Sequence, residues 1–330
     1  MQPVDFSRNV VCIMGLPFDA IGMDEAVERV RAAARQRVPC FVSTPNLNFV
    51  VAARSDDAFR DSVLHSQLSL ADGMPIVWAA RLLGLPVRER VSGAGLFEAL
   101  GRAARPALKV FFFGGADGVA QAACEQLNRQ KGGIECVGFE SPGFASVDAM
   151  SSDEHIERIN LAAPDFVVVS LGAKKGQAWI ERNRARLNAP VISHLGAVVN
   201  FAAGTVQRAP MWVQRLGLEW AWRIKEEPGL WKRYAGDAIA LARMLAGGVI
   251  PLWWQRLRSR PDSGAAKATA GLELRDSTAV LTLTGRCVAV HADVLREAFA
   301  QAATAAVPRV RVDLAAVDQI DAAAIGLLLL

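Results

Sequence analysis

The 330 residues are enough for two domains, and a 52% share of apolar residues is ample for buried cores. A net charge of only +4 argues against binding of nucleic acid or another polyanion along the whole chain, and a mean hydropathy of +0.21 is high for a freely soluble protein. Four histidines without a paired spacing argue against a structural metal site, and we expect no cofactor.

The five cysteines are scattered, form no Cys-x-x-Cys pair and lie partly within apolar runs. This pattern predicts buried, reduced thiols in a cytosolic protein. Asp5, Arg8 and Asp19 interrupt the N-terminus, so we expect no signal peptide there. Because no run of about 18 uncharged apolar residues occurs, we also expect no membrane-spanning helix.

Apolar runs alternate with helical patterns from Val10 to about Phe201. Their spacing predicts helices over 24–35, 57–65, 75–83, 117–129, 153–161 and 177–187, and strands over 39–43, 68–71, 109–113, 134–137, 166–171 and 190–194. Strands separated by such helices form βαβ units, so the expected fold class is α/β, a Rossmann-like, mostly parallel sheet with helices on both faces. In such sheets ligands bind beyond the carboxyl ends of the strands.

The composition changes after residue 205. Six of the eight tryptophans lie within 209–258, and ten basic residues against four acidic ones give the stretch 205–260 a charge of +6, which leaves −2 for the rest. This pattern suits an anionic membrane surface or a phosphorylated partner. Arg243 interrupts the apolar run, which favours a segment that lies on the membrane over one that crosses it.

The end of the chain alternates again, with strands expected over 279–283 and 310–314 and a helix over 292–303. The chain stops on four leucines, which predicts an incomplete second domain. We therefore expect four parts, which are an α/β core over 1–205, a Trp/Arg-rich helical appendage over 206–258, a linker over 259–270 and a partial α/β domain over 271–330.

Two short motifs follow predicted strands. Thr44-Pro45-Asn46 places hydroxyl and amide groups at the carboxyl edge of the sheet, and an ordinary turn is the alternative. Asp72-Gly73 suits a general base beside a glycine that lets a ligand approach the backbone. A plain N-cap for the next helix is the alternative interpretation of Asp72.

Three further segments could meet phosphate groups. Residues 88–95 offer Ser92, Arg90 and backbone N–H groups before a helix. Gly114-Gly115 joins a strand to a helix and could hold a pyrophosphate, although a tight turn explains it equally. A nicotinamide site, with Glu140 on the ribose, would need a GxGxxG pattern that is incomplete here. Residues 170–177 carry two lysines that either face a diphosphate or are solvated.

Taken in order, these motifs resemble the WecG/TagA/CpsF glycosyltransferase family over roughly residues 10–245. Each early motif is weak alone, but their order is specific. The resemblance rests on Thr44-Pro45-Asn46, Ala71-Asp72-Gly73, Glu89-Arg90-Val91-Ser92-Gly93, Pro164-Asp165 before Val167-Val168-Val169-Ser170-Leu171-Gly172, and above all Arg208-Ala209-Pro210, Gly217-Leu218-Glu219-Trp220, Arg223, Glu227-Pro228 and Arg233-Tyr234.

The resemblance implies a metal-independent, inverting transferase. It would move a sugar, of N-acetylmannosamine type or a related hexose, from a UDP-sugar to a sugar on a polyprenyl-diphosphate carrier in bacterial surface polysaccharide synthesis. It implies Asp72 as the base for the acceptor hydroxyl, with Thr44 and Asn46 in the same pocket and Arg90 near the diphosphate. The appendage would lie on the cytoplasmic face of the membrane and close over the site. Further substrate-binding candidates are Gly114, Gly115, Lys175, Gln177, Asn200, Arg215, Arg223 and Arg233.

The sequence departs from the family pattern at three places. Gly176 and Gln177 stand where a Gln-Glu pair is usual, Asn200 replaces an Asp, and Gly229 falls in an EPxR pattern that has lost its Arg. A different donor sugar or reduced activity would follow. A catalytically weakened relative that acts as a scaffold or regulator therefore remains an alternative, as does an unrelated nucleotide-binding oxidoreductase.

The tail from Leu272 resembles part of a STAS domain. The matching strings are Val310-Arg311-Val312-Asp313-Leu314 and Ile320-Asp321-Ala322-Ala323-Ala324-Ile325-Gly326. The resemblance implies a protein partner through this part. Ala322 replaces the family's phosphorylatable serine, so we expect no phosphorylation switch at that position.

Overall fold

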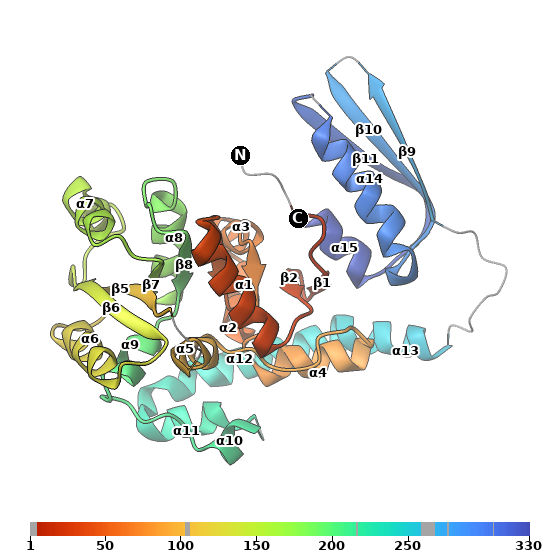
Figure 1. Ribbon diagram of the computed structural model, residues 1–330. Coiled ribbons are helices and arrows are strands. Elements are labelled where there is room, and N and C mark those ends of the chain that lie inside the picture. Colours follow the sequence, from red (N-terminus) through yellow and green to blue (C-terminus); the bar gives the residue numbers. More distant parts are fainter. Residues whose placement is uncertain (1–4, 103–105, 216, 259–267, 276, 306) are drawn as a thin grey trace. The chain divides into compact units, whose positions relative to one another are not determined.

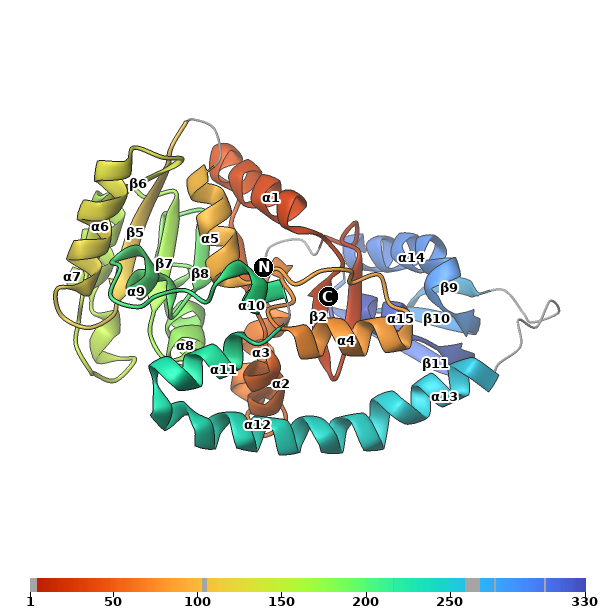
Figure 2. The ribbon, with the colours of Figure 1, turned by 90° about the horizontal axis from the view of Figure 1, so that it is seen from below.

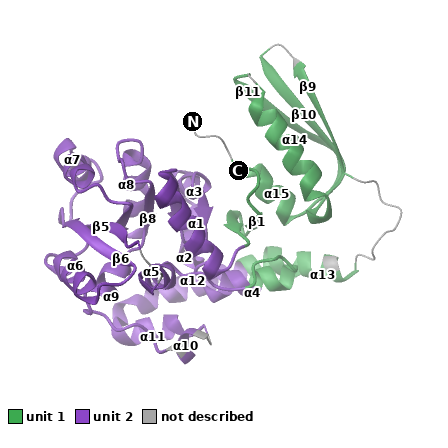
Figure 3. Cartoon of the chain, viewed as in Figure 1, with its two compact units in different colours: residues 1–20, 79–88, 244–330 green, residues 21–78, 89–243 purple. Residues whose placement is uncertain are grey.

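The computed structural model describes residues 5–102, 106–215, 217–258, 268–275, 277–305 and 307–330 (Figure 1). The chain divides into two compact units (Figure 3). The core unit comprises residues 21–78 and 89–243, and the terminal unit comprises residues 1–20, 79–88 and 244–330.

A six-stranded sheet of order β4-β3-β8-β7-β5-β6 forms the centre of the core unit, and all its neighbouring strands pair in parallel. The strands are β3 (Cys40–Ser43), β4 (Leu68–Ser69), β5 (Leu108–Gly114), β6 (Ile134–Glu140), β7 (Phe166–Ser170) and β8 (Val191–His194). Every residue of β7, Phe-Val-Val-Val-Ser, is buried, as expected of a parallel strand covered on both faces. The predicted α/β fold with a mostly parallel sheet is confirmed.

Helices cover both faces of this sheet (Figures 1 and 2). Successive side chains of a strand point to opposite faces, so Phe112 of β5 packs in one core with α1, α5 and α6, whereas Phe113 packs in the other with α7 and α8. The helices in these two cores are α1 (Met23–Gln36), α5 (Gly93–Arg102), α6 (Val119–Gln130) and α9 (Val198–Ala202) on one face, and α7 (Asp153–Leu161) and α8 (Ala173–Asn183) on the other. The chain also forms α2 (Leu47–Ala53), α3 (Asp57–Leu64) and α4 (Met74–Leu83), and the last residues of α4 belong to the terminal unit.

The Trp/Arg-rich segment is helical, as predicted, and consists of α10 (Met211–Arg215), α11 (Glu219–Glu226), α12 (Trp231–Met244), a π-helical turn (Leu245–Val249) and α13 (Ile250–Arg258). Among the described residues, Pro228–Gln255 is long and apolar enough to cross a membrane by length and composition. This corrects the expectation that no such helix exists. A search for uncharged runs passes it over because Asp237 and Arg243 interrupt it.

The terminal unit contains the antiparallel hairpin β1 (Val10–Ile13) and β2 (Leu16–Asp19) and a sheet of order β11-β10-β9. These strands are β9 (Thr269–Arg275), β10 (Thr278–Cys287) and β11 (Arg309–Ile320), with helices α14 (Ala292–Thr304) and α15 (Ala322–Leu328). Most of the expected linker, residues 259–267, lies outside the described residues.

Helix α15 packs closely on β1 inside the terminal unit. A Cβ atom on Gly326 would lie 2.4 Å from the carbonyl oxygen of Val10. Phe6 stacks on Phe299 of α14, with ring centroids 5.8 Å apart. The N-terminal hairpin is therefore part of the fold of the C-terminal segment.

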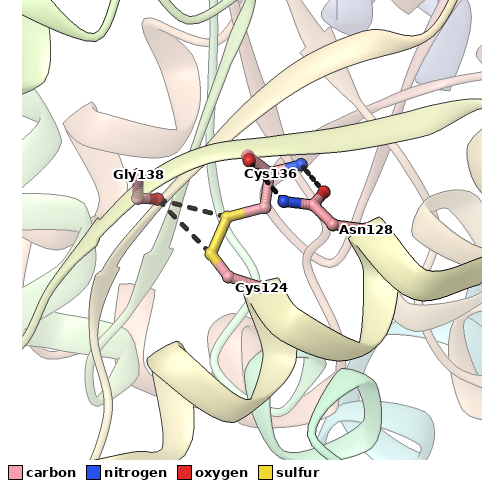
Figure 4. Close-up of a disulfide and its surroundings, with 4 residues drawn as sticks. All are labelled: Cys124, Asn128, Cys136 and Gly138. Atoms are coloured by element: carbon pink, nitrogen blue, oxygen red, sulfur yellow. Dashed lines mark hydrogen bonds between the residues drawn. A yellow bond between two sulfur atoms is a disulfide. The ribbon is translucent and has the colours of Figure 1, made fainter. Parts of the chain in front are cut away.

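Cys124 and Cys136 form a disulfide, so the prediction of reduced thiols is wrong for this pair (Figure 4). The two residues are 12 positions apart, but α6 packs on β6 and brings their Cα atoms to 5.1 Å. The Asn128 side chain accepts from the N–H of Cys136 over 2.8 Å and donates to its carbonyl over 2.9 Å. Sequence spacing alone does not contain this tertiary relationship.

Candidate active site

The segments that follow β3 and β4 run side by side at the carboxyl edge of the sheet. The N–H of Leu70 donates to the carbonyl of Ser43 over 2.9 Å, and that of Asp72 donates to the carbonyl of Pro45 over 3.0 Å. A Cβ atom on Gly73 would lie 3.8 Å from Cβ of Asn46. The fold thus brings together the two motifs that the sequence suggests for catalysis.

Asp72 is a partly buried carboxylate whose Oδ2 accepts a hydrogen bond from the N–H of Gly93 over 3.3 Å. Burial is the main influence on its pKa, which rises from the ordinary 3.8 to about 6. The positive charges of Arg90 and Arg208 and the Gly93 N–H oppose this rise, and the Glu219 carboxylate adds to it. A carboxylate with a pKa this close to neutrality can accept a proton efficiently from a hydroxyl group.

Thr44 and Asn46 flank this carboxylate in different ways. Thr44 is 7% exposed, and its Oγ1 lies 3.2 Å from the position that a Cβ atom on Gly93 would take. The Asn46 side chain accepts from the N–H of Phe49 over 3.2 Å and so caps α2. Thr44 therefore lies beside the start of α5, whereas Asn46 fixes the start of α2.

Arg90 forms a two-pronged ion pair with Glu219, the first residue of α11. The N–H groups that the sequence offers to a phosphate are used internally. Gly93 donates to Asp72, and Gly95 donates to Oγ of Ser92 over 3.1 Å. Arg90 is thus bound to a carboxylate from outside this loop, that of Glu219.

Gly114 and Gly115 form a tight turn between β5 and α6, with φ angles of 97° and 92°. A Cβ atom on Gly114 would lie 2.7 Å from the carbonyl oxygen of Ser170, and one on Gly115 would lie 3.3 Å from Val199. Only glycine fits this turn, because both the backbone angles and the close neighbours exclude a side chain.

Gln177 lies inside the protein, 1% exposed, and its amide donates to Oγ of Ser43 over 3.0 Å. Ser66 donates to the same hydroxyl over 2.7 Å. Gln177 thus supports the end of β3 from beneath the Thr44 motif. Lys175 instead donates to the carbonyl of Ala145 over 3.1 Å at the surface. Asn200 is partly buried in the last turn of α9.

The arginines of the appendage differ in surroundings. Arg223 of α11 is partly buried, and Arg233 of α12 is exposed and stacks over Tyr234 at 4.9 Å. The side chain of Arg215 lies outside what the structure describes. Asp237 of α12 is buried and accepts from the Asn48 amide over 3.5 Å, which fixes one face of α12 on α2.

Glu219 and Arg208 are the site residues that sequence reasoning did not single out. Arg208 pairs with Glu98 of α5 and contributes to the potential at Asp72. Both residues lie in the strings that carry the family resemblance. That membership was the available signal, but Arg90 and Glu219 are 129 positions apart in the sequence, and their spacing gave no hint of the pairing.

A cavity of about 410 Å³ adjoins this group along α5, α6 and α9. Its wall is mainly apolar and includes Phe97, Leu127 and Phe201, with Arg208 among the charged lining residues. Arg208 and its partner Glu98 both line this cavity, whereas Asp72 does not. Within the described ranges, no three His, Cys, Asp or Glu side chains gather so that they could hold a metal ion.

Residues 11–259 match the glycosyl transferase WecG/TagA/CpsF family. The chain is 29% identical over 199 residues to a protein of Bacillus spizizenii and 30% identical over 199 residues to one of Bacillus subtilis, which in each case covers 60% of this chain and 76% of the relative. It is 27% identical over 226 residues to a Staphylococcus aureus protein, covering 68% of this chain and 86% of the relative. All three are named N-acetylglucosaminyldiphosphoundecaprenol N-acetyl-beta-D-mannosaminyltransferase. With three quarters of its length matched, this chain belongs to the WecG/TagA/CpsF family of glycosyltransferases.

Proposed function

We propose that this protein transfers a sugar from a UDP-sugar to the sugar of a polyprenyl-diphosphate carrier, with inversion, during synthesis of a bacterial surface polysaccharide. Family membership and the names of the relatives support the lipid-linked acceptor and an N-acetylmannosamine-type donor. The observation that carries the proposal is Asp72, a carboxylate with a pKa raised to about 6 at the carboxyl edge of a parallel sheet.

The proposed reaction is one displacement. The Asp72 carboxylate takes the proton of the acceptor hydroxyl group while the oxygen of that hydroxyl group bonds to the anomeric carbon of the donor. The bond between that carbon and the diphosphate breaks, and UDP leaves with the electron pair. One base suffices, because inversion requires no covalent enzyme intermediate. Thr44 lies beside the start of α5 that Asp72 contacts, and Asn46 orders the neighbouring helix.

The leaving diphosphate must be stabilised by positive charge and N–H groups, since we propose that no metal takes part. Arg90 is the first candidate because it lies close enough to act on Asp72 electrostatically. Gly114 and Gly115 form the turn after β5 at the same edge of the sheet, and Gln177 supports the end of β3. Lys175, Asn200, Arg215, Arg223 and Arg233 complete the proposed substrate-binding set.

We further propose that residues 206–258 attach the protein to the cytoplasmic face of the membrane and close over the active site. Large apolar side chains are exposed on these helices, among them Trp212, Trp220, Trp231 and Trp254. A partly buried contact of Asp237 with Asn48 supports a surface position for α12, because one face of the helix is used for packing inside the protein.

Residues 271–330 are proposed to be a partial STAS-like module that binds a protein partner. The order β10, α14, β11, α15 supports this interpretation, as does the parallel pairing of β10 with β11. At the start of α15, Asp321 accepts from the N–H groups of Ala323 and Ala324 over 2.9 and 3.0 Å, and Ala322 offers no hydroxyl. The partner would therefore be bound without a phosphorylation switch at this helix.

A panel of UDP-sugars with a synthetic lipid-diphosphate-sugar acceptor tests the proposal. We expect release of UDP and a glycosylated lipid, and we expect turnover to survive EDTA. Absence of transfer with every donor would favour the weakened relative that acts as a scaffold. Loss of turnover on chelation, restored by Mg²⁺ or Mn²⁺, would overturn the metal-free mechanism.

A further inference from the structure

The guanidinium group of Arg90 is held by a carboxylate of its own chain. Both of its terminal nitrogens donate to Glu219, one of them to Oε1 over 3.2 Å. The two side chains are largely shielded from water, with exposed fractions of 13% for Arg90 and 26% for Glu219. Burial increases the strength of this pair relative to a solvent-exposed one.

A tightly packed turn at Gly217 precedes Glu219 and positions its carboxylate. Gly217 has φ +74°, and a Cβ atom on it would lie 2.6 Å from Cγ of Met74 and 3.5 Å from the ring of Trp78. Met74 begins α4, two residues after Asp72. The turn at Gly217 therefore sits on the helix that follows the proposed base, and Glu219 reaches Arg90 from there.

The N–H groups of Arg90 that bind Glu219 could equally bind a diphosphate. Guanidinium groups bind carboxylates and phosphates through the same paired N–H geometry. A diphosphate that approaches Arg90 must therefore displace Glu219 or share Arg90 with it, and the two anions repel each other. The second arginine near Asp72, Arg208, is likewise paired with a carboxylate, that of Glu98.

We propose that Glu219 is an internal competitor of the substrate diphosphate at Arg90, so that diphosphate binding releases the start of α11 from the active site. This inference rests on the proposed function for the identity of the ligand. Glu219 would therefore contribute to specificity. A neutral ligand that displaced it would leave Arg90 without an anionic partner, whereas a diphosphate replaces the lost ion pair with a new one.

Binding of UDP and of inorganic pyrophosphate to the full chain, measured by titration calorimetry, tests this role. In Glu219→Gln the competing charge is gone, and we expect the Kd for both ligands to fall by about tenfold, the size of one charged hydrogen bond. Glu226→Gln removes the same charge from the exposed end of α11 and should leave both Kd values unchanged. An unchanged or higher Kd in Glu219→Gln, at parental thermal stability, would overturn the proposal.

A second variant changes the position of Glu219 and retains its charge. Gly217→Ala displaces the turn from Met74 but retains Glu219, so it should also tighten pyrophosphate binding. Gly229→Ala, where a Cβ atom meets open space, is its control. If both Glu219→Gln and Gly217→Ala weaken binding instead, the segment supports the site and does not compete.

The pH dependence of kcat/KM gives a further readout. Arg90, Arg208, Glu219 and the Gly93 N–H are the groups that act on Asp72. The Glu219 carboxylate raises the pKa of Asp72, so in Glu219→Gln the acid limb of the profile, which reports this pKa, should move to lower pH. An acid limb that stays in place would contradict the closeness of Glu219 to Asp72.

If the parent binds pyrophosphate as described but transfers no sugar, the proposed function fails while the competition stands. If neither parent nor Glu219→Gln binds either ligand, the competition itself is refuted.

Discussion

The N–H of Gly93 donates to the carboxylate of Asp72 over 3.3 Å, so that the start of α5 faces the proposed catalytic base. The positive end of a helix normally favours the ionised form of a carboxylate. Here burial is the stronger influence, and the pKa of Asp72 still rises to about 6. The carboxylate is thus oriented by the helix and kept basic by its surroundings.

Replacement of this carboxylate should stop the chemistry and preserve the fold. In Asp72→Asn we expect turnover to fall by about 10² or more, the usual effect of losing a general base, while the Kd for UDP stays within a few fold of the parent. Steady-state kinetics and calorimetry on the same preparation would measure the two effects. Turnover close to that of the parent would remove Asp72 from the mechanism.

The raised pKa of Asp72 also predicts a pH dependence of stability. The folded protein holds the Asp72 proton more tightly than the unfolded chain does, so the free energy of unfolding contributed by this group decreases as pH rises from about 4 to about 6. Above that window the ionised carboxylate costs up to about 3 kcal/mol. Asp72→Asn should therefore melt at a higher temperature than the parent at pH 7.5, and the difference should vanish near pH 4. Equal differences at both pH values would contradict the burial of this charge.

Gly93 should tolerate no side chain. A Cβ atom there would lie 2.5 Å from Leu195 and 3.2 Å from Oγ1 of Thr44. Gly93→Ala should therefore cost about 1–3 kcal/mol of stability, as overpacking does, and reduce turnover by moving the N–H away from Asp72. Gly101→Ala lies in the same helix, with its nearest neighbour at 3.8 Å, and should retain parental turnover in the same assay.

Membrane association should depend on the exposed tryptophans of the C-terminal helices. Trp231 and Trp254 are each about half exposed. Changing both to Ala should lower partition to vesicles that contain anionic lipid by about tenfold or more, because each indole contributes on the order of 1–3 kcal/mol at an interface. Phe144→Ala removes a fully exposed aromatic ring from a loop and should have no effect on a flotation assay. Raised salt should weaken binding of the parent by screening its arginines.

The tight approach of α15 to β1 makes Gly326 a stability determinant. Its substitution by Ala places a Cβ atom 2.4 Å from the Val10 carbonyl oxygen, so the hairpin and helix must separate. We expect Gly326→Ala to make the terminal unit more sensitive to limited proteolysis. Gly271→Ala, in β9 of the same unit and facing open space, should leave the cleavage pattern unchanged. Identical patterns for both variants would show that the contact contributes little.

The sequence predicted the core well where one physical signal dominated. The run from Phe166 to Val169 is apolar throughout, as both faces of β7 are covered, so the position of this strand was clear. Asp72 stood out because polar residues after buried strands share one edge of a parallel sheet. The hairpin β1–β2 was missed because its turn uses Met14 and Gly15, both with positive φ, and Met is unusual at such a position. Helix α2 was missed because Asn46 appeared as part of an extended turn, whereas its side chain caps a helix.

Interactions between distant parts of the chain could not be predicted in the same way. The pairing of Arg90 with Glu219, and of Cys124 with Cys136, depends on how helices pack against the sheet. The linear sequence showed these residues only as a charge in a loop, an acid in a basic segment and two scattered thiols. Periodicity reports which face of an element is buried but not which element covers it.

The packing of β1 against α15 also makes folding of the terminal unit depend on a non-local contact. Val10 and Gly326 approach each other within this unit although they stand more than 300 positions apart in the chain. Contacts between residues so distant in sequence form slowly, because the entropy of closing the long loop must be lost before the contact stabilises anything. The six strands of the core sheet all lie within residues 40–194, a much shorter stretch. In refolding experiments we therefore expect the core sheet to gain protection from hydrogen exchange before β1 and α15 do.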